Sequence, residues 1–346
     1  MQPQKTFSEL KHYMESLPIF VILDSQYARS KTSAIAANKT TEEQYAELVK
    51  KLEVLLLDKL QNNPRESVRE LPFTSLFSLS DMIIYSIVKS GELFQLVMSP
   101  DYISKYLPCH SLNVAFISCK IGMGMRFSYE QLGQLGVAAL LHDIGMTQLS
   151  PGIYEHQGTL SSDKRKAIES HSVLGYKFFE KVRDDFPWLM QAILESHKRE
   201  NNRGYPAMVQ NEMHIYSKII GVADTFEALC HNRSFRKAYH PTDAMKTIIN
   251  GKKEYFATAI LRATIESLAI YPVGSLVQLN NRNIAQVINT IEGAPMMPIV
   301  KIIGEDDLNE ATEQKVINLS EENNLYITGL VYSTQYLTPD KIKRVQ

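Results

Sequence analysis

Apolar residues recur at helical spacing along most of the first 271 positions of this 346-residue chain. The earliest clear case is 40–61, where Thr followed by Glu precedes apolar positions three and four residues apart; this pattern predicts a capped helix. The run 18–23 is apolar throughout and fits either a buried strand or the start of a helix. Between 96 and 271 the helical segments follow one another closely, joined by short stretches with Gly, Pro or Asn. The pattern therefore predicts an all-α central domain.

The pattern changes after residue 271 to short, β-like apolar runs. Runs at 275–291, 296–303 and 324–333 predict strands, with a turn at Asn280–Asn283. The fold class is therefore mainly α, with a small β-rich tail. The predicted parts are an N-terminal, mostly helical regulatory or dimerisation module (1–95), the central helical domain (96–271) and a β-rich C-terminal extension (272–346).

Composition narrows the class of protein. The chain is 44% hydrophobic and 22% charged, with a net charge of −1, which argues against a general nucleic-acid binder because such a domain is strongly basic. Its three cysteines show no paired spacing and are typical of reduced thiols. We find neither a signal-like apolar segment at the N-terminus nor an apolar run of membrane-spanning length, so we expect a cytoplasmic protein without a membrane partner.

Six polar residues interrupt the apolar faces of the predicted central helices. The pair His142–Asp143 directly follows the apolar run Val137–Leu141, and Asp224 lies among core-type residues in 219–226. Burying such groups costs free energy unless a cation or several hydrogen-bond donors face them. The six residues are His110, His142, Asp143, His171, His197 and Asp224.

Two interpretations of these six residues are open. Taken singly, each histidine fits a hydrogen-bonded core or surface residue, and Asp224 fits a capped core aspartate. Taken together, five helices each present a metal-ligating group, and imidazole with carboxylate suits Fe, Mn or Zn. Two ions about 3.5–4 Å apart stabilise both the attacking and the leaving oxygen of a phosphoryl displacement. The set therefore favours a metal site for phosphate chemistry.

The order of these motifs is similar to that of a known family. His110, the sequence "HDIG" at 142–145 and Asp224 resemble the HD superfamily of metal-dependent phosphohydrolases. More narrowly, the chain resembles the HD-GYP family over roughly residues 100–303. The segments that carry this resemblance are "ESH...G" (169–175), "SHKRENNRGYP" (196–206), "VADTFEAL" (222–229), "RSFRKA" (233–238) and "YPVGSLVQLNNRNIAQVI" (271–288).

The resemblance implies an HD-type helical bundle that hydrolyses cyclic di-GMP with two divalent transition-metal ions, with Fe or Mn favoured over Zn, Ni or Mg. It implies one metal site formed by His110, His142, Asp143 and Asp224. His171 and His197 would hold the second ion, with Asp143 as the bridge, and Asp143 and His142 would be the catalytic residues. The substrate would be bound by Gly204, Tyr205, Pro206, Arg233 and Arg236, since guanidinium groups suit phosphate oxygens.

Three of the chain's departures from the family pattern bear on the predicted metal and phosphate chemistry. Met146 follows "HDIG" where the family usually has Lys, and a thioether can neither carry positive charge nor act as an acid. Ser196 precedes His197 where two adjacent histidines are usual, which removes one potential ligand. Tyr106 stands where members with three metals carry Glu, so we expect two ions.

These departures leave three hypotheses. The leading one is a divergent, binuclear cyclic di-GMP phosphodiesterase, slowed by the loss of a general acid. The second is a metal-binding domain that acts as a nucleotide receptor, or contacts a protein partner through the Gly204–Pro206 loop and a second copy through 1–95. The third is an HD phosphohydrolase for another nucleotide.

Overall fold

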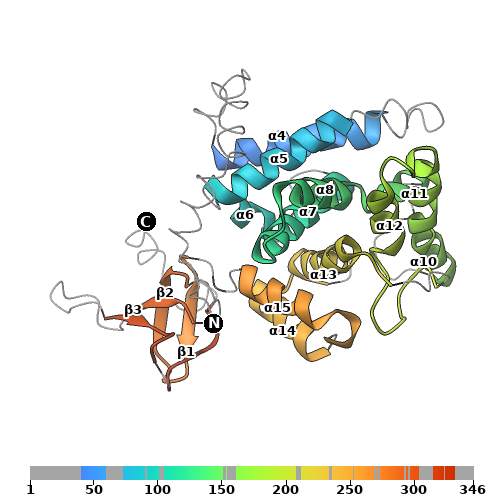
Figure 1. Cartoon of the computed structure of the whole chain (residues 1–346). Helices are drawn as coiled ribbons and strands as arrows, with labels where there is room; N and C mark the ends of the chain where they lie inside the picture. Colours follow the sequence, from blue (N-terminus) through green and yellow to red (C-terminus); the bar gives the residue numbers. More distant parts are fainter. Residues whose placement is uncertain are drawn as a thin grey trace. The chain divides into compact units, whose positions relative to one another are not determined.

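The computed structural model describes residues 40–59, 73–89, 92–99, 101, 105–150, 153, 161–207, 212–233, 236–251, 253–268, 271, 273–291, 294, 297–303, 315–322 and 324–331. The chain divides into two compact units, 1–264 and 265–346. The first is helical and the second holds an antiparallel sheet (Figure 1). The mainly α fold class is confirmed.

The first unit begins with helices that precede the candidate site. They are α4 (Thr41–Glu53), the π-helical η1 (Val54–Lys59), α5 (Phe73–Lys89) and α6 (Glu92–Val97). The capped helix predicted from 40 onward is confirmed, because Thr40 and Glu43 bond each other's backbone N–H groups as a capping box. The predicted element at 18–23 lies outside the described residues.

The central helices follow in chain order. They are α7 (Tyr106–Gly124), α8 (Tyr129–Leu141), η2 (Ile144–Gln148), α10 (Ser162–Glu169), α11 (His171–Phe179), η3 (Glu180–Val182), α12 (Pro187–Glu195), α13 (Ile215–Cys230), α14 (Pro241–Gly251), η4 (Lys253–Tyr255) and α15 (Thr258–Ser267). The helices expected between residues 96 and 271 are thus observed in the described part of the chain.

Helix α7 lies at the centre of this unit. It packs against α8 and α13, and also against α4 and α5 from the N-terminal part of the chain (Figure 1). Its residues are buried over nearly the whole length from Leu107 to Gly122, which is typical of a helix without a solvent-facing side. Helices α4–α6 therefore share a compact unit with the helices that carry the six predicted ligands. The regulatory or dimerisation role of 1–95 stays a prediction.

The second unit contains a five-stranded antiparallel sheet in the order β4-β3-β2-β1-β5. The strands are β1 (Leu276–Leu279), β2 (Ile284–Asn289), β3 (Ile299–Ile303), β4 (Val316–Asn318) and β5 (Ile327–Leu330). Alternate residues of β1 and β2 are buried, so one face of the sheet forms a small core. The turn at 280–283 is confirmed, with Leu279 N–H donating to the Asn283 carbonyl. Sequence analysis missed β4, which is three residues long and therefore leaves little alternation to detect.

Candidate metal centre

The end of α8 positions the His142–Asp143 pair. The helix stops at Leu141, and the 3-10 helix η2 turns the chain so that both side chains face the interior. His142 Nδ1–H donates to the Ala139 carbonyl at 2.8 Å, which fixes the tautomer and leaves Nε2 as the free acceptor. His171, at the start of α11, repeats this arrangement because its Nδ1–H donates to the Ile168 carbonyl at 2.6 Å. Two helix ends thus aim imidazole Nε2 atoms at one point, and the Ser172 hydroxyl lies 3.4 Å from the Nε2 atom of His171.

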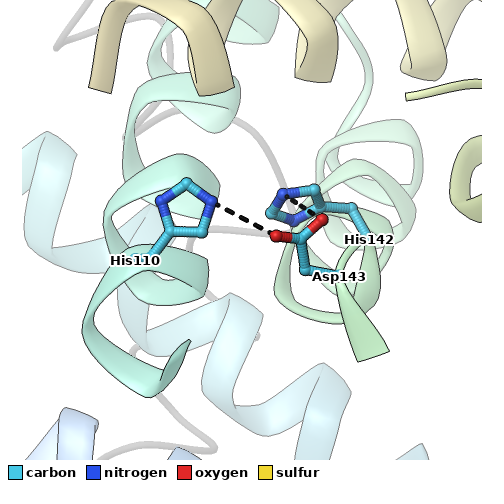
Figure 2. Close-up of side chains that lie close together, drawn as sticks. All are labelled: His110, His142 and Asp143. Atoms are coloured by element: carbon cyan, nitrogen blue, oxygen red, sulfur yellow. Dashed lines mark ion pairs between the residues drawn. The ribbon is translucent and has the colours of Figure 1, made fainter. Parts of the chain in front are cut away.

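Asp143 occupies that point. Its Oδ1 lies 3.2 Å from His142 Nε2, 3.1 Å from His171 Nε2 and 3.0 Å from His197 Nε2. Its Oδ2 lies 3.6 Å from His110 Nε2, and Figure 2 shows the ion pairs that join His110 and His142 to the carboxylate. Asp143 therefore contacts imidazoles from four separate segments of the chain.

Asp224 completes the cluster from α13. Its Oδ1 lies 3.5 Å from His110 Nε2, and its Oδ2 lies 3.5 Å from His197 Nδ1. Its side chain is 15% exposed, whereas those of the other five predicted ligands are at most 9% exposed. The structure brings all six residues together, and solvent reaches the cluster mainly on the Asp224 side.

Gly145 allows η2 to approach α11 closely. A Cβ atom at this position would lie 1.9 Å from the His171 carbonyl oxygen and 2.6 Å from the Gly175 nitrogen. Any side chain would therefore push apart the segments that carry Asp143 and His171. The glycine of the "HDIG" motif thus sets the distance between two parts of the cluster.

The Gly204–Tyr205–Pro206 loop lies against the cluster. Gly204 has φ +89°, and a Cβ there would lie 2.1 Å from the His197 carbonyl oxygen, so both conformation and space favour glycine. The Tyr205 ring stacks on the His197 imidazole with centroids 4.8 Å apart, and it meets the edge of His171 at 5.8 Å. Pro206 is buried. The loop predicted to bind substrate therefore borders the candidate metal ligands.

Electrostatics within the cluster favour charge separation between carboxylates and imidazoles. Burial would raise the pKa of Asp143, but the neighbouring His142 and His171 hold this pKa well below its ordinary range. Burial likewise opposes a charge on His197, yet hydrogen bonds and attraction from Asp143 and Asp224 raise its pKa to about 9. Two ionised carboxylates thus lie among imidazoles of which His110 and His197 have a raised pKa and gain protons readily, whereas burial lowers the pKa of His142. A cation entering the cluster would displace such protons.

The residues fit a pair of metal ions. Two overlapping groups, His110–His142–Asp143 and Asp143–His171–His197, each offer ligand atoms within 4.8 Å of one another. Two ligands of one ion, each about 2.0–2.2 Å from it, have separations of this order. His142 Nε2 is buried and has no hydrogen-bond partner in the structure, which is unusual for a native protein and is the state expected of a metal ligand. The imidazole and carboxylate donors suit divalent transition metals.

The three departures from the family pattern are accommodated within the fold. Met146 is buried in η2. Ser196 is also buried, and its hydroxyl lies 3.5 Å from the Ile193 carbonyl as a long hydrogen bond along α12. The Tyr106 ring stacks on the His110 imidazole at 5.1 Å, and the guanidinium of Arg233 covers Tyr106 at 4.7 Å. Tyr106 thus lies between the guanidinium of Arg233 and the predicted ligand His110.

The two predicted phosphate-binding arginines make contacts within the chain. Arg236 donates to the backbone carbonyls of Ala228 and Leu229, near the C-terminal end of α13, where a cation is favoured. Arg233 Nη2 lies 3.4 Å from Glu227 Oε2. Binding of substrate phosphates by these two residues stays a prediction.

Sequence analysis missed Glu227, which lies one helical turn after Asp224. His110 Nδ1–H donates to Glu227 Oε2 at 2.8 Å, so this buried carboxylate orients a predicted metal ligand. Burial would raise the pKa of Glu227, but His110, His231 and Arg233 lower it to about 2, so the side chain is ionised. Its position three residues after Asp224 places it on the same face of an apolar helix, and this spacing could have identified it from the sequence.

Comparison with known proteins agrees with this geometry. Residues 104–260 match the HD domain family, and residues 276–338 match the KOW domain associated with the HD domain. The six predicted ligands all lie within the segment that is similar to HD domains. The resemblance to the HD-GYP family is confirmed, at the low sequence identity expected of a divergent member.

Relatives of this chain include phosphodiesterases for cyclic dinucleotides. The chain is 23% identical to a cyclic di-GMP phosphodiesterase from Pseudomonas aeruginosa, over 62% of this chain and 52% of the relative. It is 24% identical to a cyclic di-GMP phosphodiesterase from Borreliella burgdorferi, over 65% of this chain and 58% of the relative. A 3'3'-cGAMP-specific phosphodiesterase from Vibrio cholerae is 31% identical over 45% of this chain and 33% of the relative. The chain thus spans about half the length of the first two relatives.

A solved structure shares the fold of this chain. It is an HDG"Y"P protein from Bdellovibrio bacteriovorus, which matches with a TM-score of 0.54 and 14% identity over 70% of this chain and 75% of the other. Within the described part of the chain, no helix has the length and apolar character needed to cross a membrane. The expected cytoplasmic location stays a prediction.

Proposed function

We propose that this HD domain is a phosphodiesterase that hydrolyses cyclic di-GMP with two divalent transition-metal ions. The observation that carries the proposal is the position of Asp143, whose carboxylate oxygens lie 3.0–3.6 Å from four imidazoles and belong to both candidate metal groups. The names of the relatives in Pseudomonas aeruginosa and Borreliella burgdorferi support the substrate class.

The six predicted ligands would bind two ions that share one carboxylate. His110, His142 and Asp224 would hold the first ion, His171 and His197 the second, and Asp143 both. When bound, such a pair supplies Lewis acidity at the phosphoryl group and an activated water, which together lower the barrier to hydrolysis. We infer that Fe or Mn occupies the site, because imidazoles dominate the ligands.

The chain's own residues would position the substrate on the Asp224 side, where the cluster is most exposed. The Tyr205 ring, held against His197, borders the cluster and offers a face for a nucleotide base to stack on. Arg233, fixed over Tyr106, would place a permanent positive charge near the phosphate. A buried Met146 stands where the family has Lys, so this position offers no charged donor to the substrate. We therefore expect slow turnover.

Two alternative functions remain as outcomes of one experiment. The metal-loaded full chain is incubated with cyclic di-GMP or with 3'3'-cGAMP, and linear and mononucleotide products are separated by chromatography. Asp143→Asn, which keeps the side-chain size, serves as the control. Hydrolysis of cyclic di-GMP by the wild type alone supports the proposal. Hydrolysis of 3'3'-cGAMP only would favour the third hypothesis, to which the Vibrio cholerae relative points. Tight binding without hydrolysis would favour the receptor hypothesis.

A further inference from the structure

A chain of buried hydrogen bonds runs from α4 to the candidate metal centre. Tyr45 on α4 donates its hydroxyl to Asn113 Oδ1 on α7 at 2.6 Å. Asn113 Nδ2 donates to Glu227 Oε1 on α13 at 3.3 Å, and His110 Nδ1–H donates to Glu227 Oε2 at 2.8 Å. All four side chains are at most 3% exposed. The predicted N-terminal module thus reaches a metal ligand through three successive contacts.

The neighbours of Asn113 determine which atom donates and which accepts in each of these hydrogen bonds. His231 Nδ1–H donates to the Glu227 backbone carbonyl at 2.9 Å, so His231 Nε2 carries a lone pair. Asn113 Nδ2 lies 3.2 Å from that Nε2 and gives it a second hydrogen. The Asn113 amide therefore has its oxygen toward Tyr45 and its nitrogen toward Glu227 and His231. A flipped amide would set its oxygen against a carboxylate.

Glu227 in turn fixes the tautomer of His110. An ionised carboxylate can only accept, so the His110 proton stays on Nδ1 and Nε2 faces Asp143 and Asp224, at 3.6 and 3.5 Å. Carboxylates behind metal-bound histidines orient the ring and strengthen the ligand, and their loss weakens metal binding about 10–100-fold. Arg233 Nη2, 3.4 Å from Glu227 Oε2, neutralises part of the buried charge.

We infer that Glu227 is a positioning residue for the metal ligand His110, and that Tyr45 of α4 sets, through Asn113, how firmly Glu227 is held. The inference rests on the proposed function in that it requires an ion at His110. It gives α4 a specific role, because any partner or signal that moves this helix would change metal affinity at the group containing His110. His171 and His197 are linked to this chain of bonds less directly, because Asp143 and Asp224 lie between them and His110.

The experiment titrates the metal-free full chain with Co²⁺ and follows the visible absorption of the bound ion at each binding step. Glu227→Gln keeps the shape of the side chain and removes its charge, and we expect one step to weaken about 10–100-fold. Tyr45→Phe removes one hydroxyl, and we expect the same step to weaken about twofold to tenfold, the loss that corresponds to a neutral hydrogen bond. The other step should keep its wild-type affinity in both variants.

The matched control is Tyr216→Phe. Tyr216, like Tyr45, donates its hydroxyl to a side-chain amide oxygen, that of Gln134 at 2.9 Å, but this pair does not lead to a predicted ligand. We expect unchanged Co²⁺ binding. A double-mutant cycle adds a second criterion, because Tyr45→Phe and Glu227→Gln should be non-additive in metal affinity whereas Tyr216→Phe and Glu227→Gln should be additive.

The outcomes separate this inference from the proposed function. A wild-type chain that binds no Co²⁺ refutes both. If the wild type binds two ions and Tyr45→Phe binds them with unchanged affinity, this inference is overturned but the proposed function is not. Equal weakening of both steps by Tyr45→Phe and Tyr216→Phe would mean that the hydroxyls only stabilise the fold, and also overturns it. If Glu227→Gln fails to fold, as judged by circular dichroism, Tyr45→Phe against Tyr216→Phe decides the question.

Discussion

Replacing Gly145 by Ala should weaken the second candidate metal group without unfolding the protein. The added Cβ would lie 1.9 Å from the His171 carbonyl oxygen, and contacts under 3.0 Å do not persist. The segments must therefore separate by at least 1.1 Å (3.0 − 1.9), which is about half of a metal–ligand bond of 2.0–2.2 Å. Overpacking of this kind costs about 1–3 kcal/mol of stability.

The assay compares Gly145→Ala with Gly133→Ala. Gly133, on α8, faces Phe77 carbons at 3.7 and 3.8 Å, which is ordinary contact distance, so Ala fits there. Denaturant unfolding gives the stability difference, and Co²⁺ titration gives the two affinities. We expect at least a tenfold loss at one binding step for Gly145→Ala and wild-type affinities for Gly133→Ala. Wild-type affinity at both steps in folded Gly145→Ala protein would refute the idea that this glycine sets the spacing of Asp143 and His171.

Three further predictions follow from the same cluster. Asp143→Ala should lose both ions together because the carboxylate belongs to both groups; elemental analysis that finds one ion retained would contradict a shared ligand. Met146→Lys should raise turnover of cyclic di-GMP more than substrate affinity, since an added ammonium would stabilise charge that develops in the transition state; equal turnover at matched metal content would argue against this. Metal affinity should rise with pH up to about 9, because the raised pKa of His197 means that a proton must leave below that value before a metal can bind; a flat affinity profile between pH 6 and 9, measured with Mn²⁺, would disagree.

The sequence was informative where polar residues stood out against an apolar background. His142 and Asp143 directly follow the buried helix α8, and Asp224 lies among buried residues of α13, so their chemistry could be predicted without coordinates. Glu227 escaped notice because helix ends and exposed faces often carry a glutamate, and only the fold shows that this one is fully buried behind His110. The chain of bonds from Tyr45 joins residues 68 and more positions apart, a separation that periodicity cannot reveal.

In the C-terminal extension and the N-terminal helices, the sequence likewise predicted elements but not the elements that they pack against. Apolar alternation revealed β1 and β2, but not that β5 pairs with β1, since strand order depends on long-range contacts. Helix α4 was recognised from its capping box, yet nothing in its own pattern indicated that it packs on α7. Local signals identify elements, whereas the partners of each element follow from the fold of the whole unit.

The burial of α7 has a consequence for the order in which the ions would leave. A helix without a solvent-facing side exchanges its amide hydrogens only when the whole unit opens, so His110 would release its ion in global unfolding. His171 follows α10 after one residue, and α10 has no buried residue, so this edge can open in a smaller, sub-global event. Under mild denaturant the ion at His171 and His197 should therefore be chelated first, while amide hydrogens of α7 remain protected.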